Sequence, residues 1–337
     1  MPIRILLALI LSAILSSCAG TYSTNRNEHI IYYATNRGDG DNSSKFNDRL
    51  SVNITYGFAE YKSDGEIKHN NKDEAYLTDK IKSNDYVTIY IHGLNNSFND
   101  AILTSVNLKD RANLTNNHIV INYSWPAKKS IMFIPIAYTH DQQMQEAALP
   151  HFKDFLENTV IKNIKESAKL NIVAHSMGNR IIMNAIESLR PETVSRISTI
   201  NLIAADLGYG EFSLLLNRNI NKINGVVTVY TSVNDYVLLL SCEVSQIPKL
   251  GRMPASSLIT SSDSSEFSNK CLNNNQIPYP LLSSNNSNKL FTVDARNAGD
   301  NSEETGPVFG AHNYVEGLCI MNLNSSWRGK PTPKTED

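Results

Sequence analysis

Short apolar runs rich in β-branched residues alternate along the chain with stretches of helical periodicity, and this alternation limits the fold more than any other feature. Near-continuous apolar runs are typical of parallel strands covered by helices on both faces. The sequence therefore predicts an α/β fold with a mainly parallel, twisted sheet. The predicted strands of this type are residues 86–91, 118–123, 170–174, 197–204, 226–231 and 290–293, and the predicted helices are residues 98–111, 141–168, 177–189 and 211–217.

The length of 337 residues would allow two domains at about 150 residues each, but a single α/β domain can be as long. We expect one domain over residues 29–325, opening with antiparallel strands at 30–34 and 51–61. Residues 240–289 are rich in Ser, Asn and Pro, and they predict an irregular polar insertion before the last strand, either over a site or as a surface loop. Residues 326–337 are expected to be a disordered tail.

Charge and motif content exclude several functions. The chain has 31 basic and 33 acidic side chains and a formal charge of −2, so it lacks the basic patch expected of a nucleic-acid-binding protein. Phosphate-binding loops, H-E-x-x-H, C-x-x-C and EF-hand motifs are all missing from the sequence. We therefore expect no metal and no nucleotide cofactor.

The N-terminus has the pattern of a secretory signal. Arg4 precedes an apolar run at 5–15 that is well short of the roughly 20 residues needed to span a membrane. Leu-Ser-Ser before Cys18 resembles a bacterial lipobox, which implies a lipoprotein signal peptide at 1–17, lipidation of Cys18 and a tether at 18–28. An ordinary signal peptide with an incidental cysteine is the alternative. Ala19 follows Cys18 where Asp would favour inner-membrane retention, so the resemblance implies a lipid-anchored envelope protein, at the outer membrane facing the periplasm if the cell is Gram-negative.

Besides the lipidated Cys18, three cysteines would remain after cleavage, in a compartment that permits disulfides. An odd number allows at most one internal bridge. We favour Cys242–Cys271, because both lie in the polar segment that would gain most from a cross-link, and we expect Cys319 to be a buried free thiol.

A strand–turn–helix motif predicts a nucleophile. The predicted strand at 170–174 is followed by His175-Ser176-Met177-Gly178 and then an apolar-periodic helix. A nucleophile elbow needs small residues two positions before and after the nucleophile, and Ala174 and Gly178 occupy those positions. The motif predicts that Ser176 Oγ is exposed above the sheet edge, close to the first backbone amides of the helix.

Two backbone amides are candidates for an oxyanion hole. One such donor comes from the residue after the nucleophile and the other from the loop after an earlier strand. Met177 is the first candidate. The strand at 86–91 ends in His92-Gly93, so Leu94 is the second, and His92 is expected to tie this loop down rather than to act as a base.

The general base and acid follow from chain order, because in this type of fold the order is Ser, acid, His. His312 is the one histidine after Ser176. Asp235 follows the strand at 226–231 and is our preferred acid, which would fix the tautomer of His312. Asp206, after the strand at 197–204, is the alternative acid.

These elements together resemble the α/β-hydrolase superfamily over nearly the whole mature chain. Residues 33–37 (Tyr-Ala-Thr-Asn-Arg), 90–93, 123–126 (Tyr-Ser-Trp-Pro) and 174–178 resemble a poorly characterised bacterial family known mainly as hydrolases of unknown function. The resemblance implies an α/β-hydrolase fold and a Ser-Asp-His hydrolase of uncertain substrate. Trp125 and Pro126 either line an acyl pocket or brace the turn after their strand.

The sequence therefore predicts a membrane-anchored serine hydrolase, similar to esterases and lipases, that cleaves carboxylic esters or lipid-like substrates through an acyl-enzyme. Two alternatives remain open. The chain is either a non-catalytic envelope lipoprotein that uses the fold to bind a partner, or an acyltransferase in which an alcohol or amine replaces water. The oligomeric state is not predicted.

Overall fold

A computed structural model describes residues 28–39, 46–112, 114, 116–128, 134–253, 289–295 and 312. The predictions for the signal peptide, the tether, Cys18, Cys271, Cys319 and the C-terminal tail lie outside the described residues. So does the segment 254–288 within the predicted insertion.

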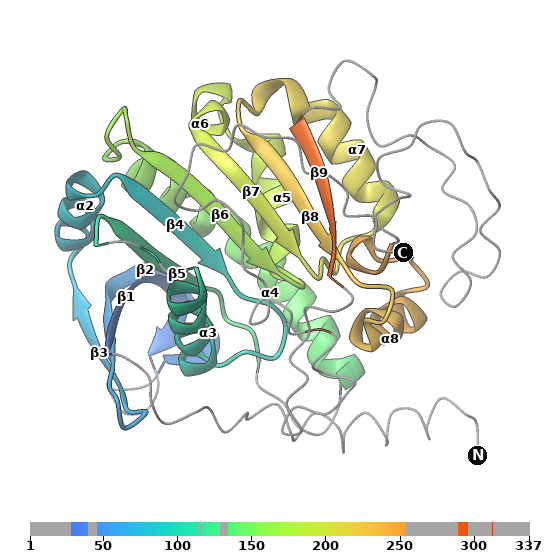
Figure 1. The fold of residues 1–337 in the computed structure, drawn as a ribbon. Coiled ribbons are helices and arrows are strands. Elements are labelled where there is room, and N and C mark those ends of the chain that lie inside the picture. The colour runs from blue at the N-terminus through green and yellow to red at the C-terminus, as the bar shows by residue number, and fades with distance from the viewer. Residues whose placement is uncertain are drawn as a thin grey trace, which may run out of the picture.

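The described residues form a nine-stranded sheet in the order β3-β2-β1-β5-β4-β6-β7-β8-β9 (Figure 1). β1 and β4 to β9 are mutually parallel, whereas β2 is antiparallel to β1 and β3 is antiparallel to β2. This confirms the predicted parallel sheet and the antiparallel opening. The strands are β1 (His29–Asp39), β2 (Phe46–Tyr61), β3 (Ile67–Lys72), β4 (Tyr86–Ile91), β5 (His118–Ser124), β6 (Lys169–His175), β7 (Ile197–Ile203), β8 (Val226–Thr231) and β9 (Leu290–Asp294).

Helices cover both faces of the sheet, as Figure 1 shows for α3 on one side and for α4 and α5 on the other. The larger core cluster joins the sheet to α2, α4, α5 and α7, and the smaller one joins it to α3 and α8. The helices are α2 (Glu74–Ser83), α3 (Phe98–Arg111), α4 (Ile134–Asp154), α5 (Gly178–Ser188), α6 (Pro191–Ser195), α7 (Tyr209–Asn219) and α8 (Tyr236–Ser245), and short helical turns follow at Phe155–Ile161, Ile220–Lys222 and Leu250–Arg252.

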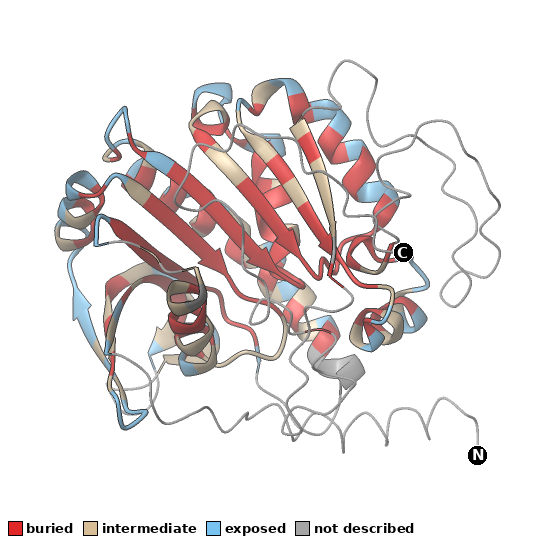
Figure 2. Cartoon of the chain, in the orientation of Figure 1, coloured by how far each residue is buried: buried red, intermediate tan, exposed pale blue. Residues whose placement is uncertain are grey.

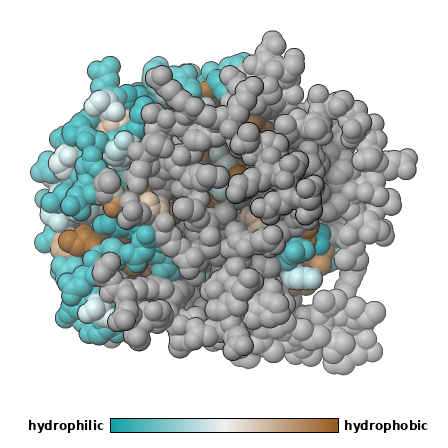
Figure 3. All heavy atoms as spheres, in the orientation of Figure 1, coloured by the Kyte–Doolittle hydropathy of each residue, from teal (hydrophilic) through white to brown (hydrophobic). Residues whose placement is uncertain are grey.

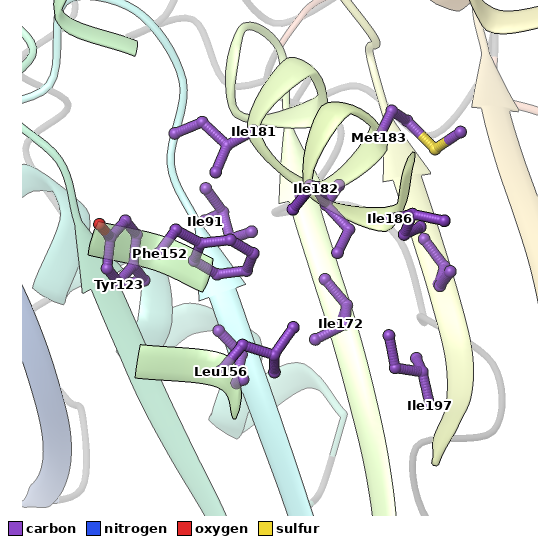
Figure 4. Packing of buried hydrophobic residues seen from close by; sticks show 14 of the residues in the cluster. Ile91, Tyr123, Phe152, Leu156, Ile172, Ile181, Ile182, Met183, Ile186 and Ile197 are labelled. Atoms are coloured by element: carbon purple, nitrogen blue, oxygen red, sulfur yellow. The ribbon is translucent and has the colours of Figure 1, made fainter. Parts of the chain in front are cut away.

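The central strands bury both of their faces, which accounts for their continuous apolar sequence. In β6, Ile172 belongs to the larger cluster and its neighbour Val173 to the smaller one. Figure 2 shows β4, β6 and β7 buried over most of their length. Figure 4 shows Ile172 among side chains of β4 and α5. This rigid centre carries the loops at the carboxyl edge of the sheet, where ligand sites of such sheets lie.

Some elements differ from the sequence prediction. β3 and α2 were not predicted, because β3 contains one apolar residue among polar ones and the apolar face of α2 is narrow. The helix predicted at 141–168 begins earlier, at Ile134, and its second half is a π-helical turn at Phe155–Ile161. α8 occupies the first residues of the segment predicted to be irregular, since Asp235 caps it by accepting from the N–H of Leu238 at 2.9 Å.

The described surface around α2 and β3 is mostly hydrophilic (Figure 3). Of the helices in the described part of the chain, none combines the length and apolar character needed to cross a membrane.

Substituting Ile172→Ala is expected to lower the free energy of unfolding by about 2–5 kcal/mol, because it opens a cavity between β6 and α5. Val52→Ala in β2 is the matched control, since Val52 is 85% exposed and its truncation should change stability by less than about 0.5 kcal/mol. Urea unfolding measures both. Equal effects would contradict the placement of the core at β6.

Candidate active site

Ser176 lies at the junction of β6 and α5 with a left-handed backbone, φ 49°. A left-handed conformation is unfavourable for a residue other than glycine and persists only where its surroundings impose it. The N–H of Ser176 donates to the carbonyl of Ile203 (3.0 Å), and its carbonyl accepts from the N–H of Asp206 (3.2 Å) and from Asn179 Nδ2 (2.8 Å). Bonds to β7 and α5 thus hold the tight turn expected for a nucleophile elbow.

Two glycines let the loop after β4 contact this elbow. A Cβ on Gly178 would lie 2.4 Å from the carbonyl oxygen of His92, and a Cβ on Gly93 would lie 2.7 Å from Ser176 Cβ. Both distances are too short for any side chain. The two turns therefore meet with backbone against backbone, and Ser176 lies against Gly93.

The backbone amides of Leu94 and Met177 flank this contact, because each follows one of the two residues that touch, Gly93 and Ser176. Within the described residues, neither amide has a hydrogen-bond acceptor. Asn95, the next residue of the loop, has φ 60°, and its N–H donates to the buried carboxylate of Asp141 at 3.2 Å. Burial raises the pKa of Asp141, and hydrogen bonds from His140, Lys128 and Asn95 oppose that rise.

His312 and Asp235 meet at the same edge of the sheet. Nδ1 of His312 lies 2.8 Å from Oδ2 of Asp235, and both side chains are buried. The other oxygen, Oδ1, accepts from the N–H of Leu238, so this carboxylate has two partners. His312 also contacts the residue next to Ser176: its ring centroid is 4.9 Å from that of His175, and His175 Nε2 lies 3.3 Å from the carbonyl oxygen of His312. Burial and, to a smaller extent, the neighbouring His312 side chain lower the pKa of His175 to about 3, although the contact with the His312 carbonyl opposes this change.

The alternative acid, Asp206, is engaged elsewhere. Its Oδ1 lies 2.9 Å from Nζ of the fully buried Lys249 and accepts from Ser241 Oγ (2.7 Å) and the Tyr138 hydroxyl (3.4 Å). Burial opposes ionisation of Asp206, but the charges of Lys249 and Arg180 and the hydrogen bonds from Ser241 and Lys249 outweigh it and lower its pKa. The contact with His312 thus belongs to Asp235, and Asp206 joins α4, α8 and Lys249, the residue before the turn at Leu250–Arg252, beside the elbow.

His92 and Trp125 brace the loop after β4. Their rings stack at 5.1 Å with an interplanar angle of 7°, and Trp125 Nε1 donates to the carbonyl of His92 at 2.8 Å. Trp125 is fully buried, which favours the bracing role over a place in a pocket wall. Burial and the charge of Arg37 lower the pKa of His92 well below its usual value. His92 is therefore neutral, and both of its ring nitrogens lie close to backbone carbonyls, of Gly93 and Trp125.

The sequence did not predict the contribution of three buried polar residues at this edge. These are Lys249, Asp141 and Arg37. Lys249 lies in the segment predicted to be irregular, and Asp141 begins a predicted helix. A single charged residue in either kind of segment gives no indication that it is buried. Arg37 was singled out only as part of the 33–37 motif.

Cys242 is disulfide-bonded, and its partner lies outside the described residues. The specific pairing with Cys271 stays a prediction. Among the described side chains, no group of three or more His, Cys, Asp or Glu could hold a metal ion.

Comparison with known proteins gives a family match. A family described as "Alpha/beta hydrolase of unknown function (DUF900)" matches residues 69–276. A search of curated proteins finds no match.

Solved structures with a similar arrangement are distant. ESTFA in an iron-lacking apo form has a TM-score of 0.41 and 10% identity, covering 94% of this chain and 91% of that one. A serine-to-alanine mutant of LAE6, an α/β hydrolase from the metagenome of Lake Arreo, Spain, has a TM-score of 0.38 and 10% identity, covering 87% and 80%. EstE1, a thermostable carboxylesterase from a metagenomic library, has a TM-score of 0.31 and 10% identity, covering 68% and 76%.

Substituting Lys249→Met is expected to lower the free energy of unfolding at pH 7 by about 3–5 kcal/mol, because it leaves the Asp206 carboxylate buried without its counter-charge. In the wild type the pKa of Asp206 is lowered, so its carboxylate stabilises the fold above the unfolded pKa of about 3.9, and this stabilisation is lost as the pH falls through the folded value. In the variant the pKa of Asp206 is no longer lowered by Lys249 while the raising effect of burial stays, so this pKa lies higher than in the wild type and the deficit should shrink toward pH 4.

Lys165→Met is the matched control. Lys165 Nζ also lies 2.9 Å from a carboxylate, that of Asp85, but both partners are largely exposed. Such surface pairs contribute less than about 1 kcal/mol. Urea unfolding at pH 7 and pH 4 compares the two variants, and a Lys249→Met deficit no larger than that of Lys165→Met would contradict the buried pair.

Proposed function

We propose, from the premise that this chain belongs to the family of α/β hydrolases of unknown function, that it is a serine hydrolase acting on carboxylic esters. One observation carries the proposal: the 2.8 Å contact between His312 Nδ1 and Asp235, beside an elbow that holds Ser176 with φ 49°. The three side chains come from three separate segments of the chain. A structural role would not require a histidine, its orienting acid and a strained serine at the same sheet edge.

In the proposed reaction, His312 Nε2 takes the proton of Ser176 Oγ as the oxygen attacks the ester carbonyl carbon. The carbonyl π electrons move to oxygen, and the amides of Leu94 and Met177 donate to that oxyanion. The intermediate collapses, His312 protonates the leaving alcohol, and the acyl group stays on Ser176. Water, deprotonated by His312, then attacks the acyl-enzyme and releases the acid and Ser176.

Asp235 would serve this cycle by accepting Nδ1–H of His312. That bond keeps Nε2 free of a proton in the resting enzyme and stabilises the imidazolium that forms during attack. Because Oδ1 also caps α8, the carboxylate is fixed at two points and its orientation toward His312 is set by the fold.

Exposed apolar side chains on the helix that follows the acid support a substrate with an apolar portion. α8 starts directly after Asp235, and exposed apolar side chains lie on it and just beyond it: Tyr236, Val244 and Ile247. Glu243 is the one charged residue of the helix. We propose that the substrates are esters with an apolar acyl chain or a lipid-like body. Hydrolysis rates for p-nitrophenyl esters of increasing acyl chain length would define the preferred chain length.

Ser176→Ala and His312→Ala are each expected to lower kcat for a p-nitrophenyl ester at least about 10³-fold, because each removes a reacting group. Asp235→Asn should lower kcat by a similar order, since an amide would stabilise the wrong tautomer of His312. Steady-state hydrolysis of the purified protein measures these effects.

Ser188→Ala, at the exposed far end of α5, is the matched serine control and should keep wild-type kcat. Wild-type activity in folded Ser176→Ala would refute the proposal, because another group would then carry the reaction. A folded wild type whose activity does not exceed that of Ser176→Ala would also refute it and would favour a binding protein without catalysis. Addition of a competing alcohol distinguishes acyl transfer, because a transferase would form the new ester at the expense of the free acid.

We also propose that the mature protein is held in the bacterial envelope by lipid on Cys18. Expression in a bacterial host with an alkyne fatty acid should label the wild type and leave Cys18→Ser unlabelled, since the acyl groups attach at that cysteine. Cys319→Ser is the matched control and should stay labelled. Labelling retained in Cys18→Ser, or lost in Cys319→Ser, would contradict the anchor.

A further inference from the structure

Arg37, near the end of β1, is a fully buried guanidinium at the edge of the sheet that carries the candidate site. Its Nε donates to Ser124 Oγ (2.8 Å), its Nη1 to the carbonyl of Ala127 (3.0 Å) and its Nη2 to the carbonyl of Asn96 (2.7 Å). Nη2 also lies 3.4 Å from His92 Nε2. One side chain thus joins the ends of β1 and β5 to the loop after β4.

Among the residues that the structure describes, the charge of Arg37 has no close counter-ion. Its hydrogen-bond partners are neutral, and no described carboxylate forms an ion pair with it within 4 Å. Burial lowers the pKa of Arg37 to about 10, and the more distant Asp141, Asp48 and Asp100 oppose that change, so the group is still charged at neutral pH. Burying a charge without an ion partner carries a desolvation penalty, and a neutral side chain of similar size would stabilise the fold without that penalty.

One hydrogen bond of Arg37, and its contact with His92, reach the loop that carries a candidate oxyanion donor. Asn96, held through its carbonyl, uses its own Nδ2 to donate to the carbonyl of Leu94 at 2.9 Å. Gly93, one residue before Leu94, lies against Ser176 Cβ. A path of two hydrogen bonds therefore connects the guanidinium to the residue whose amide flanks Ser176.

We propose that Arg37 is a positioning residue for the oxyanion hole, acting through Asn96 and His92 on the loop that presents the Leu94 amide. Its bonds hold this loop beside Ser176, and its positive charge, which no described carboxylate pairs with, lies two hydrogen bonds from Leu94 and would favour negative charge on the substrate oxygen. The inference rests on the proposed serine-hydrolase function. Both effects act on the transition state more than on bound substrate, so they change kcat rather than KM.

The test compares Arg37→Lys, Arg37→Met and Ser124→Ala with the wild type, using p-nitrophenyl ester kinetics and thermal unfolding. Arg37→Lys keeps the positive charge but loses the planar guanidinium with its several N–H donors. Arg37→Met loses both the charge and the donors. Ser124→Ala removes one acceptor and leaves Arg37 in place. We expect kcat to fall about 10-fold for Arg37→Lys and about 100-fold for Arg37→Met, with KM within about twofold, against the 10²–10³-fold known for losing one oxyanion donor.

Arg196→Met is the matched control. The Arg196 guanidinium also donates to two backbone carbonyls, those of Glu166 and Lys165, but it lies just before β7 begins, at the opposite edge of the sheet. The Arg196→Met variant should lose some thermal stability and keep the wild-type kcat. A phenylboronic acid mimics the tetrahedral intermediate. Its affinity should fall in parallel with kcat in the Arg37 variants and be unchanged in Arg196→Met.

A folded Arg37→Met or Arg37→Lys with kcat within twofold of the wild type would overturn the inference. So would failure of both to fold combined with wild-type kcat in Ser124→Ala, because Arg37 would then serve the fold alone. Failure of the proposed function is separately visible: Ser176→Ala would then hydrolyse the ester at the wild-type rate, whatever the Arg37 variants do.

Discussion

The backbone contact between two turns is the constraint on which the rest of the site depends. Ser176 has a left-handed conformation, and the loop after β4 approaches it so closely that neither Gly93 nor Gly178 has room for a Cβ. The strain at Ser176 persists because β7 and α5 bond both ends of its peptide. The parallel central strands supply the frame, and this contact brings Ser176 and the loop that carries Leu94 together at their common edge.

Two buried aspartates at this edge have different roles, because they have different bonding partners. Asp235 caps α8 with one oxygen and bonds His312 with the other, so the start of a helix also orients a histidine from a distant part of the chain. Asp206 is bound by Lys249, Ser241 and Tyr138, and it joins helices around the elbow. Chemically equivalent carboxylates that both follow parallel strands thus differ in role because one faces a histidine and the other a lysine.

The sequence predicted the apolar central strands, the antiparallel opening and the elbow, because burial on both faces and a tight turn each impose a local residue pattern. It did not predict β3, whose alternation is hidden by polar residues on an exposed edge, or α8, which lies where composition pointed to an irregular segment. The proximity of Asp235 to His312 could be inferred from chain order. The buried partners Lys249 and Asp141, and the bonds of Arg37, could not, since their roles arise from tertiary contacts that leave no periodic signal.

The central claim is that Ser176 is the nucleophile. Its most direct test is reaction of the folded protein with a fluorophosphonate, followed by peptide mass spectrometry to locate the adduct. The account predicts one phosphonyl group on Ser176, formed in the wild type and lost in Ser176→Ala and His312→Ala. An unmodified Ser176 in folded protein, or an adduct that maps to another residue and persists in Ser176→Ala, would contradict it.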